Sequence, residues 1–475
     1  MTKTTSPIEK SSWIQNQASR YAGKLLLRHE IPIDDHNLND LIEKNIFQCI
    51  PTFFNRFLTK GCMRCGNTKR SLLGKITCAA CHHTHFYCRK CIEMGRVMEC
   101  ESLYQWTGRK PIWLKHDSPC TWKGNLTKAQ QRAANRIVQS INEGLKELLV
   151  WAVCGAGKTE MLFPGITEAL KQGKRICIAT PRADVVRELK PRIQQAFARV
   201  SVQALYGGSQ DKDATAQLIL ATTHQLLRFK EAFDVMIIDE IDAFPYHADE
   251  SLPYAANRAK NNQCTTIYLT ATPRKSQKTQ IQRKKLPHIF VPIRYHGYPL
   301  PVPQMKMVFS LKKNLQTFQP PPVFISWLNK RKNPLRQLLI FVPSISLAEQ
   351  MIKSIRQVLL REGTIEKQNQ INFVHAEDPD RAEKVQQFRD KKITVIITTT
   401  ILERGVTFPS VDVVIFDAGH DVFDEAALIQ IAGRAGRSAE DPTGDVLFFH
   451  NGKTEAMIQA ISSIKQMNRR GGVGV

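Results

Sequence analysis

The chain has 475 residues, 42% of them hydrophobic, so it can form two or three globular domains and is too apolar to be disordered. Its 67 Lys and Arg outnumber 43 Asp and Glu, and the resulting charge of +24 is spread along the whole length. Such an excess favours a polyanionic partner such as a nucleic acid, with an affinity that falls as salt rises. Charge alone leaves open a merely soluble basic protein.

The N-terminal residues are polar and lack the apolar centre of a signal peptide. No apolar run approaches the ~18–20 residues that a membrane-spanning helix needs. We therefore expect a cytoplasmic protein with no transmembrane segment of its own, whose 12 cysteines are reduced thiols. A position at the inner face of the cell membrane would depend on a partner.

The chain divides into three predicted blocks, residues 1–120, 121–290 and 291–475. Residues 274–303 carry several prolines and show no hydrophobic period, which is typical of a linker. The first block holds most of the cysteines, whereas the other two alternate short apolar strands with helical patterns.

Three Cys-x₂-Cys pairs lie in residues 60–100 of the first block. Each pair can bend into a knuckle, and two knuckles complete a tetrahedral Zn²⁺ site of structural type. Spacing alone allows any two pairs, with an iron–sulfur cluster as the alternative and with His82, His83 and His85 as substitute ligands. The pairs are Cys62 with Cys65, Cys78 with Cys81, and Cys88 with Cys91.

The strands that we predict in the second and third blocks are continuous apolar runs, which is typical of parallel sheets covered on both faces. We therefore expect two successive α/β domains. In the second block the predicted strands span 148–153, 175–180, 218–222, 235–239 and 266–270. In the third block they span 337–342, 371–375, 394–398, 411–416 and 444–449.

A phosphate-binding loop follows the first of these strands. Gly155 and Gly157 let backbone N–H groups converge on phosphate oxygens, Lys158 can reach the β- and γ-phosphates, and Thr159 can offer its hydroxyl to Mg²⁺. The first glycine of the usual pattern is replaced by Ala152, so the match is incomplete and a chance surface loop is the alternative.

Two adjacent acids end the strand at 235–239. We expect Asp239 to bind Mg²⁺ and Glu240 to polarise the attacking water, and a solvated strand end is the alternative. Near the C-terminus, Arg434 and Arg437 are separated by two small residues and can meet the γ-phosphate of ATP, whereas an ordinary basic helix is the alternative.

These motifs occur in an order that resembles the superfamily 2 helicases over roughly residues 121–455. They are Ala152–Thr159, Asp239–Asp242, Leu269–Pro273 and Gln430–Arg437. The resemblance implies two tandem RecA-like domains that close over ATP, with Gln430 in the catalytic set. It implies that Thr270 and Thr272 couple hydrolysis to movement, that Gly405 lies in a loop shared by nucleotide and strand, and that Gln130 meets the adenine. For Gln130, a helix start capped by Thr127 is the alternative. The implied nucleic-acid contacts are Thr180, Arg182, Thr222, Thr223, Ser344 and Thr398.

Further segments are similar to the ComFA family, the late-competence ATPases of DNA uptake, which are akin to the PriA replication-restart helicases. The segments are Leu25–Glu30, Tyr87–Arg96 and Asp239–Pro245, and with them the resemblance extends over nearly the whole chain. It implies that Cys62, Cys65, Cys88 and Cys91 bind zinc, with Cys78 and Cys81 as the second choice.

The sequence thus predicts an α/β protein in which a small Cys-rich zinc-binding region precedes two RecA-like domains. We expect a DNA-stimulated ATPase that uses ATP and Mg²⁺ to move single-stranded DNA, in contact with membrane channel and competence proteins. A duplex-unwinding replication-restart or RNA helicase and a non-enzymatic zinc-dependent DNA-binding adaptor are the alternatives. Basic residues suggest that the cysteine region grips DNA, unless it docks on a channel partner; they are Lys60, Arg64, Lys69, Arg70, Arg89 and Lys90.

Overall fold

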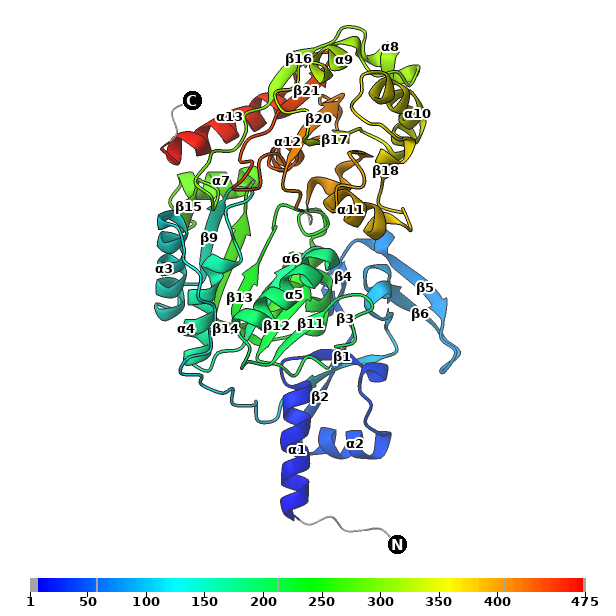
Figure 1. Cartoon of the computed structure of the whole chain (residues 1–475). Helices are drawn as coiled ribbons and strands as arrows, with labels where there is room; N and C mark the ends of the chain where they lie inside the picture. Colours follow the sequence, from blue (N-terminus) through cyan, green and yellow to red (C-terminus); the bar gives the residue numbers. More distant parts are fainter. Residues whose placement is uncertain (1–6, 57–58, 212, 405–406, 473–475) are drawn as a thin grey trace. The chain divides into compact units, whose positions relative to one another are not determined.

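A computed structural model describes residues 7–56, 59–211, 213–404 and 407–472 (Figure 1). The contacts between residues divide the chain into two compact units. One unit comprises Met1–Val150 and Thr159–Ile289, and the other comprises Trp151–Lys158 and Phe290–Val475. None of the helices in the described ranges has the length and apolar character that crossing a membrane requires.

The N-terminal part of the first unit is a small α+β region. Its three-stranded antiparallel sheet has the order β1-β8-β2 and packs an apolar core in which the Phe47 ring meets Tyr21 and Trp106 edge-on. The elements of this sheet are α1 (Pro7–Tyr21), β1 (Leu25–Leu27), α2 (Asp35–Glu43), β2 (Phe47–Pro51) and β8 (Ser102–Trp106).

Two smaller antiparallel sheets carry the cysteines. One is the pair β3 (Phe53–Arg56) and β4 (Thr59–Cys62), and the other has the order β5-β6-β7. In Figure 1 the β5–β6 hairpin projects from the rest of this N-terminal region, which we call the module. The strands of the second sheet are β5 (Leu73–Thr77), β6 (Thr84–Cys88) and β7 (Val97–Met98), and the 3₁₀ helix η3 (Arg89–Met94) lies between the last two.

The larger of the two main sheets has seven strands in the order β11-β12-β10-β13-β14-β9-β15. The neighbours from β11 to β14 pair in parallel, and β10 and β12 are buried along their whole length, as continuous apolar runs require. The strands are β9 (Glu147–Ala152), β10 (Ile176–Thr180), β11 (Val202–Leu205), β12 (Leu218–Thr222), β13 (Phe233–Ile238), β14 (Lys260–Thr270) and β15 (His288–Val291). The accompanying helices are α3 (Lys128–Asn142), α4 (Phe163–Lys171), α5 (Ala183–Ala196), α6 (Ser251–Ala259) and α7 (Lys275–Gln282).

The second sheet has six strands in the order β16-β21-β20-β17-β19-β18, and every neighbouring pair is parallel. Its strands are β16 (Gln304–Met307), β17 (Gln337–Phe341), β18 (Ile371–Val374), β19 (Val395–Thr398), β20 (Val411–Phe416) and β21 (Val446–His450). The helices of this unit are α8 (Leu311–Gln316), α9 (Pro322–Leu328), α10 (Ile345–Arg361), α11 (Arg381–Arg389), α12 (Glu425–Ala432) and α13 (Glu455–Arg470). The α/β class with two parallel sheets is therefore as predicted.

The linker predicted at 274–303 is wrong in its first half, because it contains α7 and the edge strand β15. Helix α7 buries none of its residues, so it carries no apolar stripe that a sequence pattern could reveal. Strand β14 likewise begins six residues before the predicted start at Thr266, in the polar and partly exposed run Lys260–Gln263.

Candidate active site and metal centre

The phosphate loop leaves β9 and leads through the 3₁₀ helix η4 (Glu160–Leu162) into α4. Gly155 and Gly157 have φ of 79° and 68°, a region in which only glycine is unstrained. The backbone of the loop is fixed in the second unit, where Tyr295 N donates to Gly155 O at 3.0 Å and Val153 N donates to Val291 O at 3.1 Å. The chain thus has the strand, glycine turn and helix that cradle phosphates.

The departure from the usual motif at Ala152 has a local reason. Ala152 is the last residue of β9 and is fully buried, so its backbone belongs to a strand in which a glycine is not needed. Of the two residues predicted to act on nucleotide and Mg²⁺, Lys158 is half-buried and Thr159 is buried.

The two acids that we predict to act in catalysis follow β13 directly. Asp239 N donates to Ala179 O of β10 at 2.8 Å, and Asp239 Oδ1 accepts from Glu240 N at 2.8 Å. Glu240 has φ of 53°, a left-handed conformation that is costly for a residue with a Cβ and is found mainly at functional sites. Within the described part of the chain its Oε2 atom is buried without a hydrogen-bond partner. This oxygen can therefore accept a hydrogen bond from a water molecule.

Asp242 connects the acidic strand end to the segment predicted to couple hydrolysis to movement. Its buried carboxylate accepts from Thr270 Oγ1 at 2.6 Å and from Thr272 Oγ1. Thr272 N also donates to Thr270 Oγ1 at 2.9 Å. The sequence motif contained Asp242 without a role for it, and the structure identifies it as the acceptor that joins the two motifs.

Gln130 takes part in a capping box at the start of α3. Thr127 N donates to Gln130 Oε1 at 2.8 Å, and Gln130 N donates to Thr127 Oγ1 at 3.3 Å. This is the helix-start arrangement that we weighed against adenine recognition. Contact between Gln130 and adenine stays a prediction.

The C-terminal motif begins in α12 and continues beyond it, in the second unit. Gln430 is buried, and its Oε1 accepts from Cys154 Sγ of the phosphate loop at 3.0 Å. Arg434 is also buried and donates through Nε to Glu403 O at 2.9 Å. Arg437 is half-buried and donates through Nε to Gly433 O at 2.9 Å.

Arg294 is a buried cation that sequence reasoning missed. It lies beside Gly155, and its guanidinium donates to Gly436 O in the C-terminal motif. Burial, and then the charge of Arg437, lower the pKa of Arg294 to about 10, so it stays protonated near neutral pH. Its Nε and Nη2 atoms have no partner among the described residues. Arg294 lies in the predicted linker, where no motif or hydrophobic period could have indicated a functional residue.

The predicted nucleic-acid contacts of the first sheet follow neighbouring strands. Thr180 and Thr222 end β10 and β12 and are directly paired in the parallel register. The hydroxyls of Thr180 and Thr223 are buried and unpaired within the described residues, while Arg182 forms an ion pair with Asp184 at 2.8 Å. Because these residues lie together at one edge of the sheet, they are suitably placed to contact the phosphates of a nucleic acid. That they make such contacts stays a prediction.

In the second sheet, Ser344 is exposed and caps α10 by accepting from Leu347 N at 3.2 Å. Thr398 is fully buried and donates to Val374 O at 2.8 Å, so its hydroxyl is engaged inside the sheet. Gly405, predicted to lie between nucleotide and strand, is outside the described residues.

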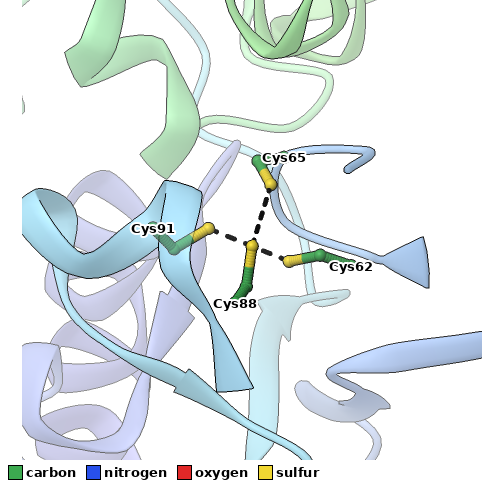
Figure 2. Close-up of side chains that lie close together, drawn as sticks. All are labelled: Cys62, Cys65, Cys88 and Cys91. Carbon is green, nitrogen blue, oxygen red and sulfur yellow. Dashed lines mark hydrogen bonds between the residues drawn. The ribbon is translucent and has the colours of Figure 1, made fainter. Parts of the chain in front are cut away.

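Four cysteine sulfurs come together in the N-terminal module (Figure 2). The sulfurs of Cys62, Cys65, Cys88 and Cys91 lie within 4.8 Å of one another, and all four residues are buried. Cys62 and Cys91 sulfurs are 3.8 Å apart, and those of Cys65 and Cys88 are 3.5 Å apart. A tetrahedron with Zn–S bonds of about 2.3 Å has edges of about 3.8 Å, so these residues fit Zn²⁺.

The chemistry of this donor set also suits a metal cation. Hydrogen bonds among the four sulfurs lower the pKa of the Cys88 thiol and raise the pKa of the Cys65 and Cys91 thiols, so the four thiols titrate as one group. Asn67 Nδ2 lies 3.9 Å from Cys88 Sγ as a further donor. The four residues come from the end of β4 and from the β6–η3 junction, as two knuckles require.

Arg64, inside the first knuckle, anchors the cysteine cluster within the first unit. Its side chain is completely buried and donates to both carboxylate oxygens of Glu30, at 3.1 and 2.9 Å. It also donates to Met94 O at 2.7 Å and to Leu227 O at 3.3 Å. From helix α6, Arg258 donates to the backbone of Met63 and Arg64.

The basic residues that suggested DNA gripping by this module are largely engaged elsewhere. Arg64 is buried against Glu30, and three lysines pair with acids: Lys60 with Glu99, Lys69 with Glu250 and Lys90 with Asp249. The Lys90 contact with Asp249, at 2.6 Å, also joins the module to the segment just before α6. Four of the six basic residues therefore already face a carboxylate, which weakens the argument for a DNA grip.

Three family models match consecutive parts of the chain. Residues 11–105 match "Competence protein ComFA N-terminal domain", residues 123–275 match "Type III restriction enzyme, res subunit", and residues 322–439 match "Helicase conserved C-terminal domain". The chain is 42% identical over 463 residues to the Competence protein ComFA of Bacillus subtilis (strain 168), a match that covers 97% of each chain. It is 37% identical over 410 residues to the Competence protein ComFA of Streptococcus pneumoniae (strain ATCC BAA-255 / R6), covering 84% of this chain and 92% of the other.

Among solved structures, the fold is similar to S. cerevisiae Dbp5 bound to RNA and ADP BeF3. The TM-score is 0.51 at 17% identity, over 72% of this chain and 88% of that chain. At this identity the likeness concerns the fold alone, and it agrees with two RecA-like domains.

Proposed function

Because the chain belongs to the ComFA family of competence proteins, we propose that it is a motor that moves single-stranded DNA during DNA import. The chain is an ATP-hydrolysing enzyme of the helicase class, so the chemistry of the motor is ATP hydrolysis. This enzyme class leaves the non-enzymatic adaptor without support. The domain assignment follows the same proposal: a zinc module within residues 1–120, ATP binding in 121–290 and the second RecA-like domain in 291–475.

The observation that carries the proposal is the bond between the phosphate loop and the C-terminal motif. Cys154 in the loop donates to Gln430, and Arg294 extends from beside Gly155 to the backbone of Gly436. A γ-phosphate in the loop would therefore change the surroundings of the segment that carries Arg434 and Arg437. A motor needs such a dependence, because each turnover must alter the position of a group that grips the strand.

The residues divide the work at the nucleotide. Lys158 and the N–H groups of the loop hold the phosphates, and Glu240 orients the attacking water. Thr159 and Asp239 would hold Mg²⁺, which neutralises phosphate charge when bound. Arg437, half-buried and bonded only through backbone and hydroxyl oxygens in the described chain, is the better arginine finger, whereas buried Arg434 positions the loop at Glu403.

The coupling segment has its own role in this proposal. Thr270 and Thr272 share the Asp242 carboxylate, so a shift of the acidic strand end on hydrolysis reaches them through hydrogen bonds. Movement of these residues would then change the grip on the strand. The adjacent strand ends that carry Thr180 and Thr222 are the proposed backbone contacts, which track a strand without reading its bases.

We propose that the motor works on the cytoplasmic side of the membrane, docked on the DNA-uptake channel and its competence proteins. The zinc-binding residues are Cys62, Cys65, Cys88 and Cys91, and zinc bound there would hold the module folded. Because four of the six basic residues around them are engaged in ion pairs, docking is the better role for the module than gripping DNA.

The direct test compares single-stranded DNA, duplex DNA and RNA as stimulators of ATP turnover by the full chain. We expect the largest stimulation with single-stranded DNA, and ATP-dependent displacement of streptavidin from one biotinylated end of it. Displacement of a paired strand with equal efficiency would favour the duplex-unwinding alternative. Stimulation only by RNA would contradict the proposal.

A further inference from the structure

A second group of cysteines lies apart from the buried four. Cys78 and Cys81 lie in the turn that joins β5 to β6, and Cys100 lies in the turn between β7 and β8. Their three sulfurs lie within 4.8 Å of one another. Cys81 and Cys100 are exposed and Cys78 is half-buried, so the group is open to solvent. The fold thus brings Cys100 next to Cys78 and Cys81, which precede it by 19 residues or more, at one end of a small sheet.

The turn that holds Cys78 and Cys81 has the form of a metal knuckle. It is closed by Cys78 N, which donates to His83 O at 2.9 Å, and by His82 N, which donates to Cys78 O at 2.9 Å. His82 takes the left-handed φ of 58° that such a tight turn needs. Backbone N–H groups of Cys81 and Ala80 donate to the Cys78 sulfur. N–H groups aimed at sulfur stabilise a thiolate in the manner of zinc knuckles.

A nitrogen ligand is also at hand. His85 Nε2 lies 3.1 Å from Cys81 Sγ. In a tetrahedral site with Zn–S of about 2.3 Å and Zn–N of about 2.0 Å, the edge between sulfur and nitrogen is about 3.5 Å. This nitrogen lies near the Cys81 sulfur but not within 4.8 Å of all three sulfurs, so His85 has to shift to become the fourth ligand.

We propose that Cys78, Cys81 and Cys100 form a second zinc site, completed by His85. Binding forms three Zn–S bonds and one Zn–N bond, and each thiol that is still protonated releases its proton to solvent. The site shares no ligand with the buried cluster. Because Cys81 and Cys100 are exposed and Cys78 is only half-buried, the second site exchanges metal more readily than the buried site.

The role that this geometry supports is structural. The second site clamps the free end of the β5–β6 hairpin to the turn before β8, a strand of the sheet that carries the core of Tyr21, Phe47 and Trp106. Without this clamp, the hairpin is joined to the module through its β6–β7 pairing and the buried cluster. The prediction of Cys78 and Cys81 as substitute ligands of one zinc is thereby replaced by a separate site.

The test is zinc content per chain, measured on the full protein purified with zinc in the medium. We expect two zinc ions in the unmodified chain, and one in the Cys78→Ser and Cys100→Ser variants with little change in thermal stability. Cys49→Ser, at an exposed cysteine of β2, is the matched control and should keep two. A single zinc in the unmodified chain, or two in both test variants, would overturn the proposal.

Kinetics of metal loss supply a second measurement. A chromogenic chelator should remove one zinc per chain at least tenfold faster than the other, and only the fast phase should vanish in Cys100→Ser. A Cys78–Cys81 disulfide in freshly purified protein, detected by mass spectrometry, would contradict the site. His85→Ala should speed the fast phase at least tenfold, whereas His83→Ala should not; equal rates would exclude His85 as the fourth ligand.

Discussion

The phosphate loop and the buried cysteine cluster both use a short turn to aim several groups at one ligand, but the protein holds them differently. In the loop, Gly155 and Gly157 form the left-handed glycine turn and Lys158 stays half-buried. In the cluster all four sulfurs are buried, and Arg64 locks the turn to Glu30 from inside. The difference suits a ligand that must leave at every turnover and one that must stay. Substitutions should accordingly separate turnover from stability.

The largest effect is expected for Cys88→Ser in the buried cluster. Structural zinc contributes ~10–16 kcal/mol of binding free energy, so loss of one ligand should remove the metal and leave the module unfolded. Zinc analysis and thermal unfolding measure this, with Cys49→Ser as the exposed control. Unchanged zinc content and melting temperature would show that the cluster is not a metal site.

The next effect is expected for Lys158→Ala, which removes the cation that we propose meets the transferred phosphate. Loss of one group that stabilises the transition state costs about 10²–10³ in rate, so ATP turnover should fall at least 100-fold while the melting temperature stays the same. Lys171→Ala, an exposed lysine at the end of α4, is the control. Retained turnover would remove the phosphate-loop assignment. A large loss of stability would contradict the idea that the loop serves turnover whereas the cysteine cluster serves stability.

Arg64→Ala tests the anchor of the cluster without touching a ligand. It leaves the buried Glu30 with Arg228, at 2.9 Å, and Leu27 N, at 2.8 Å, as its remaining partners, so we expect a loss of about 3 kcal/mol in the free energy of unfolding. ATP turnover per folded molecule should be unchanged. Arg89→Ala, on the exposed surface of the module, should change stability by less than about 0.5 kcal/mol. Equal stability of the two variants would mean that the pair with Glu30 does not hold the module.

The smallest effect is expected for Thr272→Val, which deletes one donor to Asp242. An unsatisfied buried acceptor costs about 1–3 kcal/mol, so DNA-stimulated turnover should fall roughly tenfold, and turnover without DNA should fall less. Thr272→Ser keeps the hydroxyl and should retain most of the stimulation. If both variants lose stimulation equally, the hydroxyl bond to Asp242 is not what couples the two motifs.

The sequence was sufficient for features that come from local pattern. Continuous apolar runs revealed most strands of both sheets, and the glycine and acidic motifs could be placed at strand ends because parallel strands present their ends at one edge. The four buried cysteines could be chosen among six only through the family resemblance, since spacing alone allowed any two pairs.

What the sequence could not reveal depends on tertiary contacts between distant residues. Arg294 lies in a stretch without period, and only the fold brings it to Gly436. Cys100 joins Cys78 and Cys81 across β6 and β7, outside any Cys-x₂-Cys pair. Arg64 was counted as a surface charge because a buried arginine has no signature until its partner, Glu30, is known.

The most direct test of the motor is ATP turnover at saturating single-stranded DNA of increasing length. A protein that moves along the strand and leaves at its end spends a larger share of each cycle in motion on longer strands. Turnover per molecule should therefore rise with length and reach a plateau, and Lys158→Ala should abolish the signal at every length. A rate that is independent of length once the strand fills the binding site would contradict movement along DNA.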